Sequence, residues 1–344
     1  MTPAATYRLP EVLLPEGEQR QLWVSDGRLS AAPIDGAEAL PGRFALPGLV
    51  DAHAHLSMIG MEPGDLATAN RSLRAARDQG VLAVRDVGAP RSVTLELRPA
   101  ADDPTLFVAG RWHAPEGRFY EQMARPTAPE DLIASATTEI GRGASWVKVV
   151  ADWRSDELSY DFDLLRRLIE AVHAAGARVA AHTQWPVVSD VVRAGVDSVE
   201  HGFGLDETTL DAMSARGVAW TPTLTALNRP ISPETAPDRR RFIEEARERV
   251  RALLPRALHR GVRVLAGTDA LGTIVDEVRW LVDYGLEPRD ALRAASSSGR
   301  EFLGLAALED GAPGDVTTYD ADPRDDPPVL ARPVAILRAG ARIL

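Results

Sequence analysis

The middle of the chain alternates short apolar runs, rich in β-branched residues, with longer segments in which apolar positions recur at helical spacing. This alternation indicates repeated strand-helix-strand units and a parallel sheet. Eight apolar runs predict strands, at residues 44–53, 81–87, 105–110, 145–151, 178–183, 197–202, 218–223 and 262–269. Apolar residues at helical spacing predict a helix over residues 161–175. Because eight parallel strands close a barrel, we expect an α/β fold of the (β/α)8 TIM barrel type.

The two ends of the chain have a different pattern. Short β-like pieces are separated by turn-forming or proline-rich segments near both termini. Since chain ends often lie close together, the two terminal segments can pair into one small sheet domain. We therefore expect a small β-sandwich domain from residues 1–46 and 308–344, and a barrel from residues 47–307.

Composition narrows the classes of function. The 344 residues carry a formal net charge of −11, which disfavours nucleic acid and anionic membranes as partners, because phosphate-binding surfaces are locally basic. Arginines of residues 239–251 alternate with glutamates, so this run is interpreted as a solvated helix face. No leader or membrane-spanning run is apparent, and we expect a cytoplasmic protein. The absence of cysteine excludes disulfides, thiolate catalysis and cysteine-bound zinc.

Ionisable side chains stand at the ends of several predicted strands. In a barrel of this type the active site forms where the strands end at the carboxyl face. The side chains at these ends are His53, His55, Lys148, His182, His201 and Asp269. Four of the seven histidines therefore fall at predicted strand ends, which favours a metal site over unrelated structural roles.

Each of these residues also has a simpler explanation. The paired histidines are two residues apart, so both imidazoles project to one side of a strand, where they bind one ion or hydrogen-bond to backbone carbonyls. Lys148 stands in an apolar strand, where a free ammonium is costly. It either pairs with Asp86 or Asp152, or reacts with carbon dioxide to give a carboxylate that bridges two metals. Asp269 either binds metal and accepts a proton, or caps the following helix.

Several motifs resemble those of the amidohydrolase superfamily. Residues 45–56 and 267–269 are similar to the first and last strands of that superfamily. Lys148, the Val-Glu-His-Gly motif at residues 199–202 and the segment 311–315 resemble the branch that contains imidazolonepropionase-like proteins and metal-dependent Xaa-Pro dipeptidases. The resemblance spans nearly the whole chain, and it is specific for the superfamily rather than for a substrate.

The resemblance implies a centre of two divalent metal ions. It assigns the strand-end side chains to three roles: the buried ion to His53, His55 and Asp269, the exposed ion to His182 and His201, and a bridge to N6-carboxylysine at Lys148. Zinc is the expected ion, since imidazole and oxygen ligands suit it, and manganese and iron are the alternatives. A hydroxide between the ions would attack the substrate carbonyl, and Asp269 and His201 would be the catalytic residues.

Substrate-binding residues are expected where the loops follow the strands. Aromatic and cationic side chains stand there: Arg111, Trp112, His113, Trp153, Arg154 and Trp185. Tryptophans supply aromatic surface, and a guanidinium binds a carboxylate bidentately. Peptidase-like members of the superfamily often carry Gly-Gly-His after the third strand, whereas this chain has Gly-Arg-Trp-His at residues 110–113. The resemblance alone therefore does not imply a peptidase activity.

These observations favour hydrolysis of an amide C–N bond in a small molecule, such as a dipeptide, an N-acyl amino acid or a related amide. A mononuclear deaminase or cyclic amidine hydrolase is one alternative. Deaminases commonly place a glutamate three residues after the histidine of the fifth strand, where this chain has Trp185, which disfavours that alternative. A lactonase or organophosphate hydrolase is another, and a non-catalytic binding barrel is the alternative outside enzymology. A homo-oligomer is compatible with the sequence.

Overall fold

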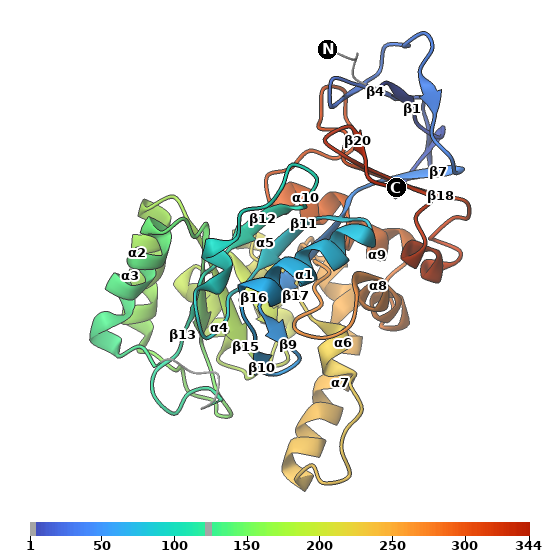
Figure 1. Cartoon of the computed structure of the whole chain (residues 1–344). Coiled ribbons are helices and arrows are strands. Elements are labelled where there is room, and N and C mark those ends of the chain that lie inside the picture. The colour runs from blue at the N-terminus through green and yellow to red at the C-terminus, as the bar shows by residue number, and fades with distance from the viewer. Residues whose placement is uncertain (1–4, 121–125) are drawn as a thin grey trace.

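The computed structural model describes residues 5–120 and 126–344. Parallel strands form the centre of the molecule, helices cover them, and sheets built from both chain ends lie at one end (Figure 1). The α-helices are α1 (Leu66–Asp78), α2 (Leu132–Gly141), α3 (Phe162–Ala174), α4 (Val188–Ala194), α5 (Glu207–Arg216), α6 (Leu224–Leu227), α7 (Pro237–His259), α8 (Ile274–Asp283), α9 (Pro288–Ala294) and α10 (Ser297–Phe302). Short 3-10 helices are η1 (Val93–Glu96), η2 (Pro129–Asp131) and η3 (Pro327–Ala331). The predicted α/β class is confirmed.

Two parallel sheets make up the centre. The first has the strand order β12-β11-β8 and the second has the order β13-β14-β15-β16-β17. Their strands are β8 (Leu49–Ala54), β11 (Val81–Asp86), β12 (Thr105–Val108), β13 (Trp112–His113), β14 (Trp146–Val150), β15 (Arg178–Thr183), β16 (Ser198–His201) and β17 (Ala219–Thr221). A small antiparallel hairpin, β9 (Met58–Ile59) with β10 (Glu62–Pro63), follows β8. Neighbouring strands follow one another along the chain, as successive βα units require.

The eighth predicted strand, residues 262–269, connects the two sheets without forming a regular strand. Isolated parallel bridges join it to β17 on one side and to β8 on the other. Its backbone approaches β8 so closely at Gly267 that a Cβ atom there would come within 2.5 Å of the His53 Cβ. The segment occupies the place that the barrel prediction gives it. Closure into one continuous eight-stranded ladder stays a prediction.

The first predicted strand, residues 44–53, is wrong as a single element. It divides at Gly48 into β7 (Phe44–Pro47), which pairs with a C-terminal strand, and β8 of the central sheet. Any larger residue at Gly48 would collide with Leu82, since a Cβ atom would come within 2.6 Å of that side chain. The Gly48 backbone donates a hydrogen bond to the Asp315 carbonyl at 2.9 Å, so the chain leaves the terminal sheet at this point.

The two chain ends pair with one another as the sequence predicts. One sheet has the order β20-β19-β18-β7-β2-β3, and a second has the order β5-β4-β1-β6. The strands are β1 (Tyr7–Arg8), β2 (Val12–Leu13), β3 (Glu18–Gln19), β4 (Trp23–Ser25), β5 (Arg28–Ser30), β6 (Glu38–Ala39), β18 (Val316–Tyr319), β19 (Ala335–Arg338) and β20 (Ala341–Arg342). Apolar side chains from both ends, such as Leu13 and Leu337, share one buried cluster. The division into domains at residues 46 and 308 stays a prediction.

Helix α3 confirms the helix predicted over residues 161–175. Asp161 caps it by accepting hydrogen bonds from the backbone amides of Asp163 and Leu164. The apolar residues that predicted the helix form its buried face, Leu164, Leu165, Leu168, Ile169 and Val172. Burial of this one face explains why its periodicity was visible in the sequence.

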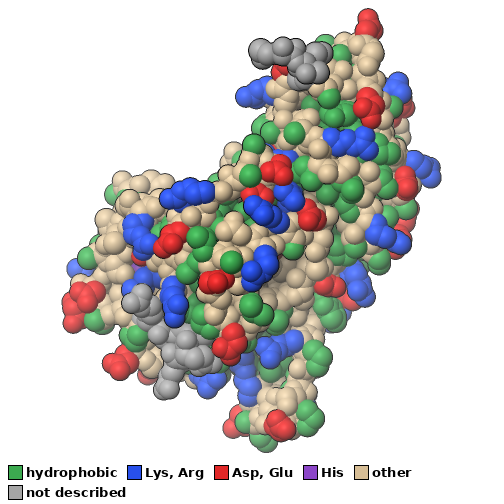
Figure 2. All heavy atoms as spheres, in the orientation of Figure 1, with side chains coloured by type: hydrophobic (Ala, Val, Ile, Leu, Met, Phe, Trp, Pro, Cys, Tyr) green, Lys and Arg blue, Asp and Glu red, His purple; other side chains and the backbone are tan. Residues whose placement is uncertain are grey.

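Acidic and basic side chains are interspersed over the face of the molecule that Figure 2 shows. A face of this kind lacks the continuous positive potential that binding to a phosphate backbone requires. In the part of the chain that the structure describes, no helix combines the length and the apolar character needed to cross a membrane.

Candidate metal centre

Three of the predicted ligands lie close enough to share one ion. His53 and His55 stand at the end of β8, and the segment that carries Asp269 is bridged to that strand. One ligand atom from each residue lies within 4.8 Å of the others, and His55 Nε2 is 3.1 Å from Asp269 Oδ1. Two imidazoles and a carboxylate are ligands that zinc and related divalent ions prefer.

The other three predicted ligands lie around the same point. The ring centroids of His182 and His201 are 4.5 Å apart, and those of His53 and His201 are 5.2 Å apart. Lys148, on β14, lines the same pocket as His182, His201 and Asp269. Their strands are parallel, so their carboxyl ends reach the same edge. The structure therefore brings all six predicted ligands to one place.

Hydrogen bonds hold three of the imidazoles with Nε2 available for the centre. His53 Nδ1 lies 2.6 Å from Glu200 Oε2, and His55 Nδ1 bonds to a backbone carbonyl. His201 Nδ1 lies 2.7 Å from the Thr223 hydroxyl, whose own proton goes to a backbone carbonyl. Each acceptor takes the Nδ1 proton and leaves the Nε2 lone pair free. This is the tautomer that a metal-binding histidine needs.

Three buried polar atoms at the centre have no hydrogen-bond partner within the described chain. They are His53 Nε2, Lys148 Nζ and His182 Nε2. Buried polar atoms are nearly always paired, so unpaired atoms that converge on one point indicate that another group binds between them. Imidazole nitrogens, a carboxylate and an amine that can be carboxylated make a donor set that fits divalent metal ions.

Burial sets the protonation of these side chains. It lowers the pKa of His53 and His201 to about 3 and the pKa of Lys148 to about 8. Burial alone would raise the pKa of Asp269, but the adjacent His55 side chain and the imidazoles of His53 and His201 hold that pKa well below its ordinary value. Neutral imidazoles and an ionised carboxylate are the forms that bind metal.

Backbone strain collects at the same strand ends. The angle φ is +67° at His201, +62° at Asp269 and +50° at Thr223. Left-handed conformations of such residues cost roughly 1–3 kcal/mol each and persist only where the surroundings impose them. Buried Asp51 supplies part of that constraint, because it accepts hydrogen bonds from the Thr268 amide at 3.2 Å and the Thr268 hydroxyl at 2.6 Å. These two hydrogen bonds fix the backbone next to Asp269.

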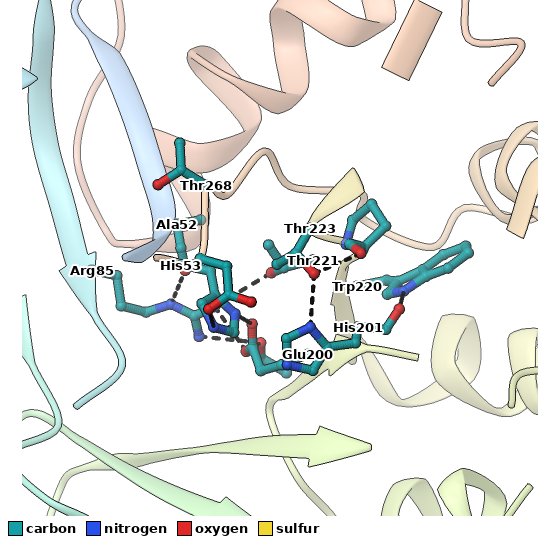
Figure 3. Close-up of polar contacts among 12 residues, drawn as sticks. Ala52, His53, Arg85, Glu200, His201, Trp220, Thr221, Thr223 and Thr268 are labelled. Atoms are coloured by element: carbon teal, nitrogen blue, oxygen red, sulfur yellow. Dashed lines mark hydrogen bonds and ion pairs between the residues drawn. The ribbon is translucent and has the colours of Figure 1, made fainter. Parts of the chain in front are cut away.

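A fully buried network that sequence reasoning missed lies behind His53 (Figure 3). Arg85 of β11 donates a hydrogen bond to Glu200 Oε1 at 2.8 Å, while the other oxygen of Glu200 bonds to His53. Arg85 also bonds to the Ala52 carbonyl, and its guanidinium lies 4.5 Å from the centre of the Trp146 ring. Burial would raise the pKa of Glu200, but Arg85 and His53 hold it well below its ordinary value. Glu200 is therefore an ionised acceptor that orients His53.

Two signals for this network were present in the sequence. Arg85 interrupts an apolar strand, where an unpaired guanidinium is costly, and Glu200 immediately precedes a predicted ligand. Neither signal shows that these two residues pair with each other, because Arg85 and Glu200 are 115 positions apart in the chain.

Glu200→Gln should weaken metal binding by about 10- to 100-fold, the usual cost of losing a carboxylate that orients a ligating histidine. Isothermal titration with zinc measures this effect without any assay of activity. Glu277→Gln is the matched control, since Glu277 is equally buried but bonds to backbone amides of α6. Equal zinc affinity in Glu200→Gln and wild type would show that Glu200 has only a structural role.

A pocket of about 320 Å³ opens over the candidate ligands. Trp112 and Trp153, two of the predicted substrate-binding residues, line it together with Phe119 and Tyr120. The Trp153 and Tyr120 rings lie 4.6 Å apart, and the Trp112 and Phe119 rings lie 5.1 Å apart. These side chains form a continuous aromatic wall beside the centre.

The other four predicted substrate-binding residues, Arg111, His113, Arg154 and Trp185, lie outside the lining that the described residues form. His113 alternates with Trp112 along β13 and therefore points the other way, so its ring bonds to the Lys148 carbonyl and to a hydroxyl of α2. Trp185 packs against Phe242 of α7, with 4.8 Å between ring centroids. Arg111 donates a hydrogen bond to a threonine hydroxyl at 2.9 Å.

The model of the amidohydrolase family matches residues 44–341, and the chain belongs to this family. An uncharacterized protein of Mycobacterium tuberculosis is 35% identical, over 95% of this chain and 93% of the relative. An imidazolonepropionase of Saccharopolyspora erythraea is 24% identical, over 91% of this chain and 88% of the relative.

Solved structures show the same fold. An Xaa-Pro dipeptidase with bound methionine in its active site superposes with a TM-score of 0.83, over 98% of this chain and 99% of that one, at 19% identity. The family that the sequence resemblance implied is therefore confirmed, and the α/β fold of the chain matches that of this structure.

Proposed function

We propose that the protein is a metal-dependent hydrolase that cleaves the amide C–N bond of a small substrate. The observation that carries this proposal is the convergence of the predicted ligands on one point at the base of an aromatic pocket. Three buried nitrogens there have no hydrogen-bond partner among the described residues. Two divalent ions, zinc by the donor set, would polarise the substrate carbonyl and lower the pKa of water. The name of the structural neighbour, an Xaa-Pro dipeptidase, agrees with an amide substrate.

The proposed ligand assignment follows the grouping of side chains around the point of convergence. One ion would be held by His53, His55 and Asp269, and the other by His182 and His201. Lys148, carboxylated on Nζ, would bridge them. We assign catalysis to Asp269 and His201.

Carboxylation of Lys148 is favoured by its surroundings. Lys148 is 3% exposed, and neither acid offered as a partner by the sequence is available to it. Asp86 accepts hydrogen bonds from two backbone amides and a threonine hydroxyl, and Asp152 accepts from the amides of residues 184 and 185. Lys148 is also the only lysine in the chain, and all the other residues in its Lys+Arg count are arginines. A carboxylate on Nζ removes the cost of a buried, unpaired ammonium.

Asp269 is proposed to move the proton. Its alternative role as a helix cap is wrong, because the cap of α8 is Thr273, which forms a capping box with Asp276. Asp269 instead faces the pocket with His55 beside it. An ionised carboxylate at this place accepts a proton from the attacking water and returns it to the leaving nitrogen.

A panel of small amides tests the proposal. Zinc-supplemented protein should release free amine from dipeptides or N-acyl amino acids, a chelator should abolish the release, and added zinc should restore it. Lactones, organophosphate esters and aminated heterocycles should be assayed in parallel, because they are substrates of the alternative activities. Ammonia release from a heterocycle, or ester cleavage without amide cleavage, would replace the proposal with one of the alternative activities.

A further inference from the structure

The outer part of the pocket carries positive charge that the proposed chemistry does not use. Arg229 and Arg239 line this outer part, whereas Asp269, at the candidate metal centre, is the one carboxylate of the lining among the described residues. The whole chain has a formal net charge of −11, so the charge of this part of the pocket is opposite in sign to that of the chain as a whole. A pocket with a local positive charge attracts anions.

Arg239 is the central member of this group. It stands near the start of α7, and its guanidinium lies 4.8 Å from the centre of the Phe242 ring. It is half-buried, and in the described part of the chain it has no hydrogen bond and no ion pair. The expectation of a solvated helix face at residues 239–251 is therefore wrong at this position, because Arg239 lines the pocket.

Other arginines of α7 show that this lack of partners is not general. Arg247 donates hydrogen bonds to the carbonyls of Leu227 and Arg229, and Arg249 donates to the Phe203 carbonyl at 2.9 Å. These contacts fasten the helix to neighbouring loops. Among the described residues Arg239 makes no such contact, so its guanidinium remains available to a ligand.

Two further guanidinium groups lie near Arg239. Arg229 lines the pocket from the loop before α7, and Arg154 lies 4.9 Å from the centre of the Trp153 ring on the aromatic wall. Burial, followed by the charges of Arg154 and Arg229, lowers the pKa of Arg239. No acid neutralises these cations among the ion pairs of the described residues, so a bound anion would relieve their mutual repulsion.

We propose that Arg239, with Arg229 and Arg154 beside it, forms a subsite for the carboxylate of the substrate. This inference rests on the proposed function and specifies its substrate class. The amide lies over the candidate ligands, a bulky apolar side chain packs on the aromatic wall, and the carboxylate reaches Arg239. The substrate is then an N-acyl or aminoacyl derivative of a large apolar amino acid with a free carboxylate.

A matched pair of ligands tests the subsite. N-acetyl-L-phenylalanine and N-acetyl-L-phenylalaninamide differ in the carboxylate, and binding of each to zinc-loaded protein can be followed by tryptophan fluorescence. Wild type should bind the acid about tenfold or more tightly than the amide, since a hydrogen-bonded charge pair contributes at least a factor of about ten. Arg239→Gln should weaken binding of the acid by about tenfold and leave the amide within about twofold.

Arg241→Gln is the control, because Arg241 is on the same helix but is exposed and lies outside the pocket lining. It should leave both affinities within about twofold of wild type, since a distant exposed charge is screened. The subsite is overturned if wild type does not prefer the acid, if Arg239→Gln keeps the preference because metal holds the carboxylate, or if Arg241→Gln removes it equally.

The same titrations separate this proposal from the proposed function. Hydrolysis of either ligand is followed separately by release of phenylalanine or its amide. Amide hydrolysis without a preference that depends on Arg239 would refute the subsite and leave the hydrolase proposal intact. A preference that depends on Arg239, in a protein that hydrolyses no amide, would support the subsite and refute the hydrolase proposal.

Discussion

Lys148→Ala is expected to reduce turnover by about 10³-fold or more and to lower the metal content. Metal polarisation of a carbonyl supplies several kcal/mol of transition-state stabilisation, and each 1.4 kcal/mol or so is a factor of ten in rate. Without Lys148 the proposed bridging carboxylate could not form. Metal analysis by mass spectrometry and steady-state kinetics measure the two effects.

Lys148→Met is the matched variant for this prediction. Methionine fills a similar volume, so a loss of activity shared by both variants does not come from a cavity. Removal of a buried, unpaired amine should leave the unfolding temperature of the metal-free protein unchanged or higher. Short carboxylic acids, added to Lys148→Ala, should restore part of the activity by standing in for the lost carboxylate. Full metal content with wild-type turnover in either variant would refute the bridging role.

Asp269→Asn is expected to lower turnover by about 10²- to 10⁴-fold, the range for loss of a general acid or base. Asparagine keeps the shape of the side chain but no longer accepts a proton at this position. Most of the metal should remain, because His53, His55 and the bridge are still present. Substrate affinity should change less than turnover, which steady-state kinetics and metal analysis resolve.

Asp276→Asn is the control for this second prediction. Asp276 belongs to the capping box of α8, the helix that follows Asp269, and lies outside the pocket lining. Its substitution reports the effect of disturbing the helix start without touching the proposed proton carrier. Turnover of Asp269→Asn within about threefold of wild type, with metal intact, would remove Asp269 from catalysis.

The candidate ligands could be anticipated from sequence because strand position determines their place. An apolar run with a polar residue at its carboxyl end marks both the strand and the edge at which it ends. Lys148, His182 and His201 each end or interrupt such a run, so parallel pairing alone brings them together. Paired histidines on the first strand follow the same logic.

The rest of the site depends on contacts that periodicity does not encode. Glu200 meets Arg85 only because β11 and β16 face one another across the interior, and the partner of a buried arginine is not visible in a linear pattern. The outer pocket comes from loops and from α7, so the sequence pattern predicts only a surface charge at Arg239. The prediction that His113 lines the pocket is wrong, because β13, a strand of two residues, is too short for the sequence to reveal which side chain points inward.

The central claim is a binuclear centre bridged by a carboxylated Lys148, and ¹³C nuclear magnetic resonance tests it most directly. Zinc-loaded protein equilibrated with ¹³C-labelled bicarbonate should show one lysine carbamate resonance, since Lys148 is the only lysine in the chain. The resonance should be absent from Lys148→Met, which also excludes the terminal amine as its source. Metal-loaded wild-type protein that shows no carbamate resonance would contradict the claim.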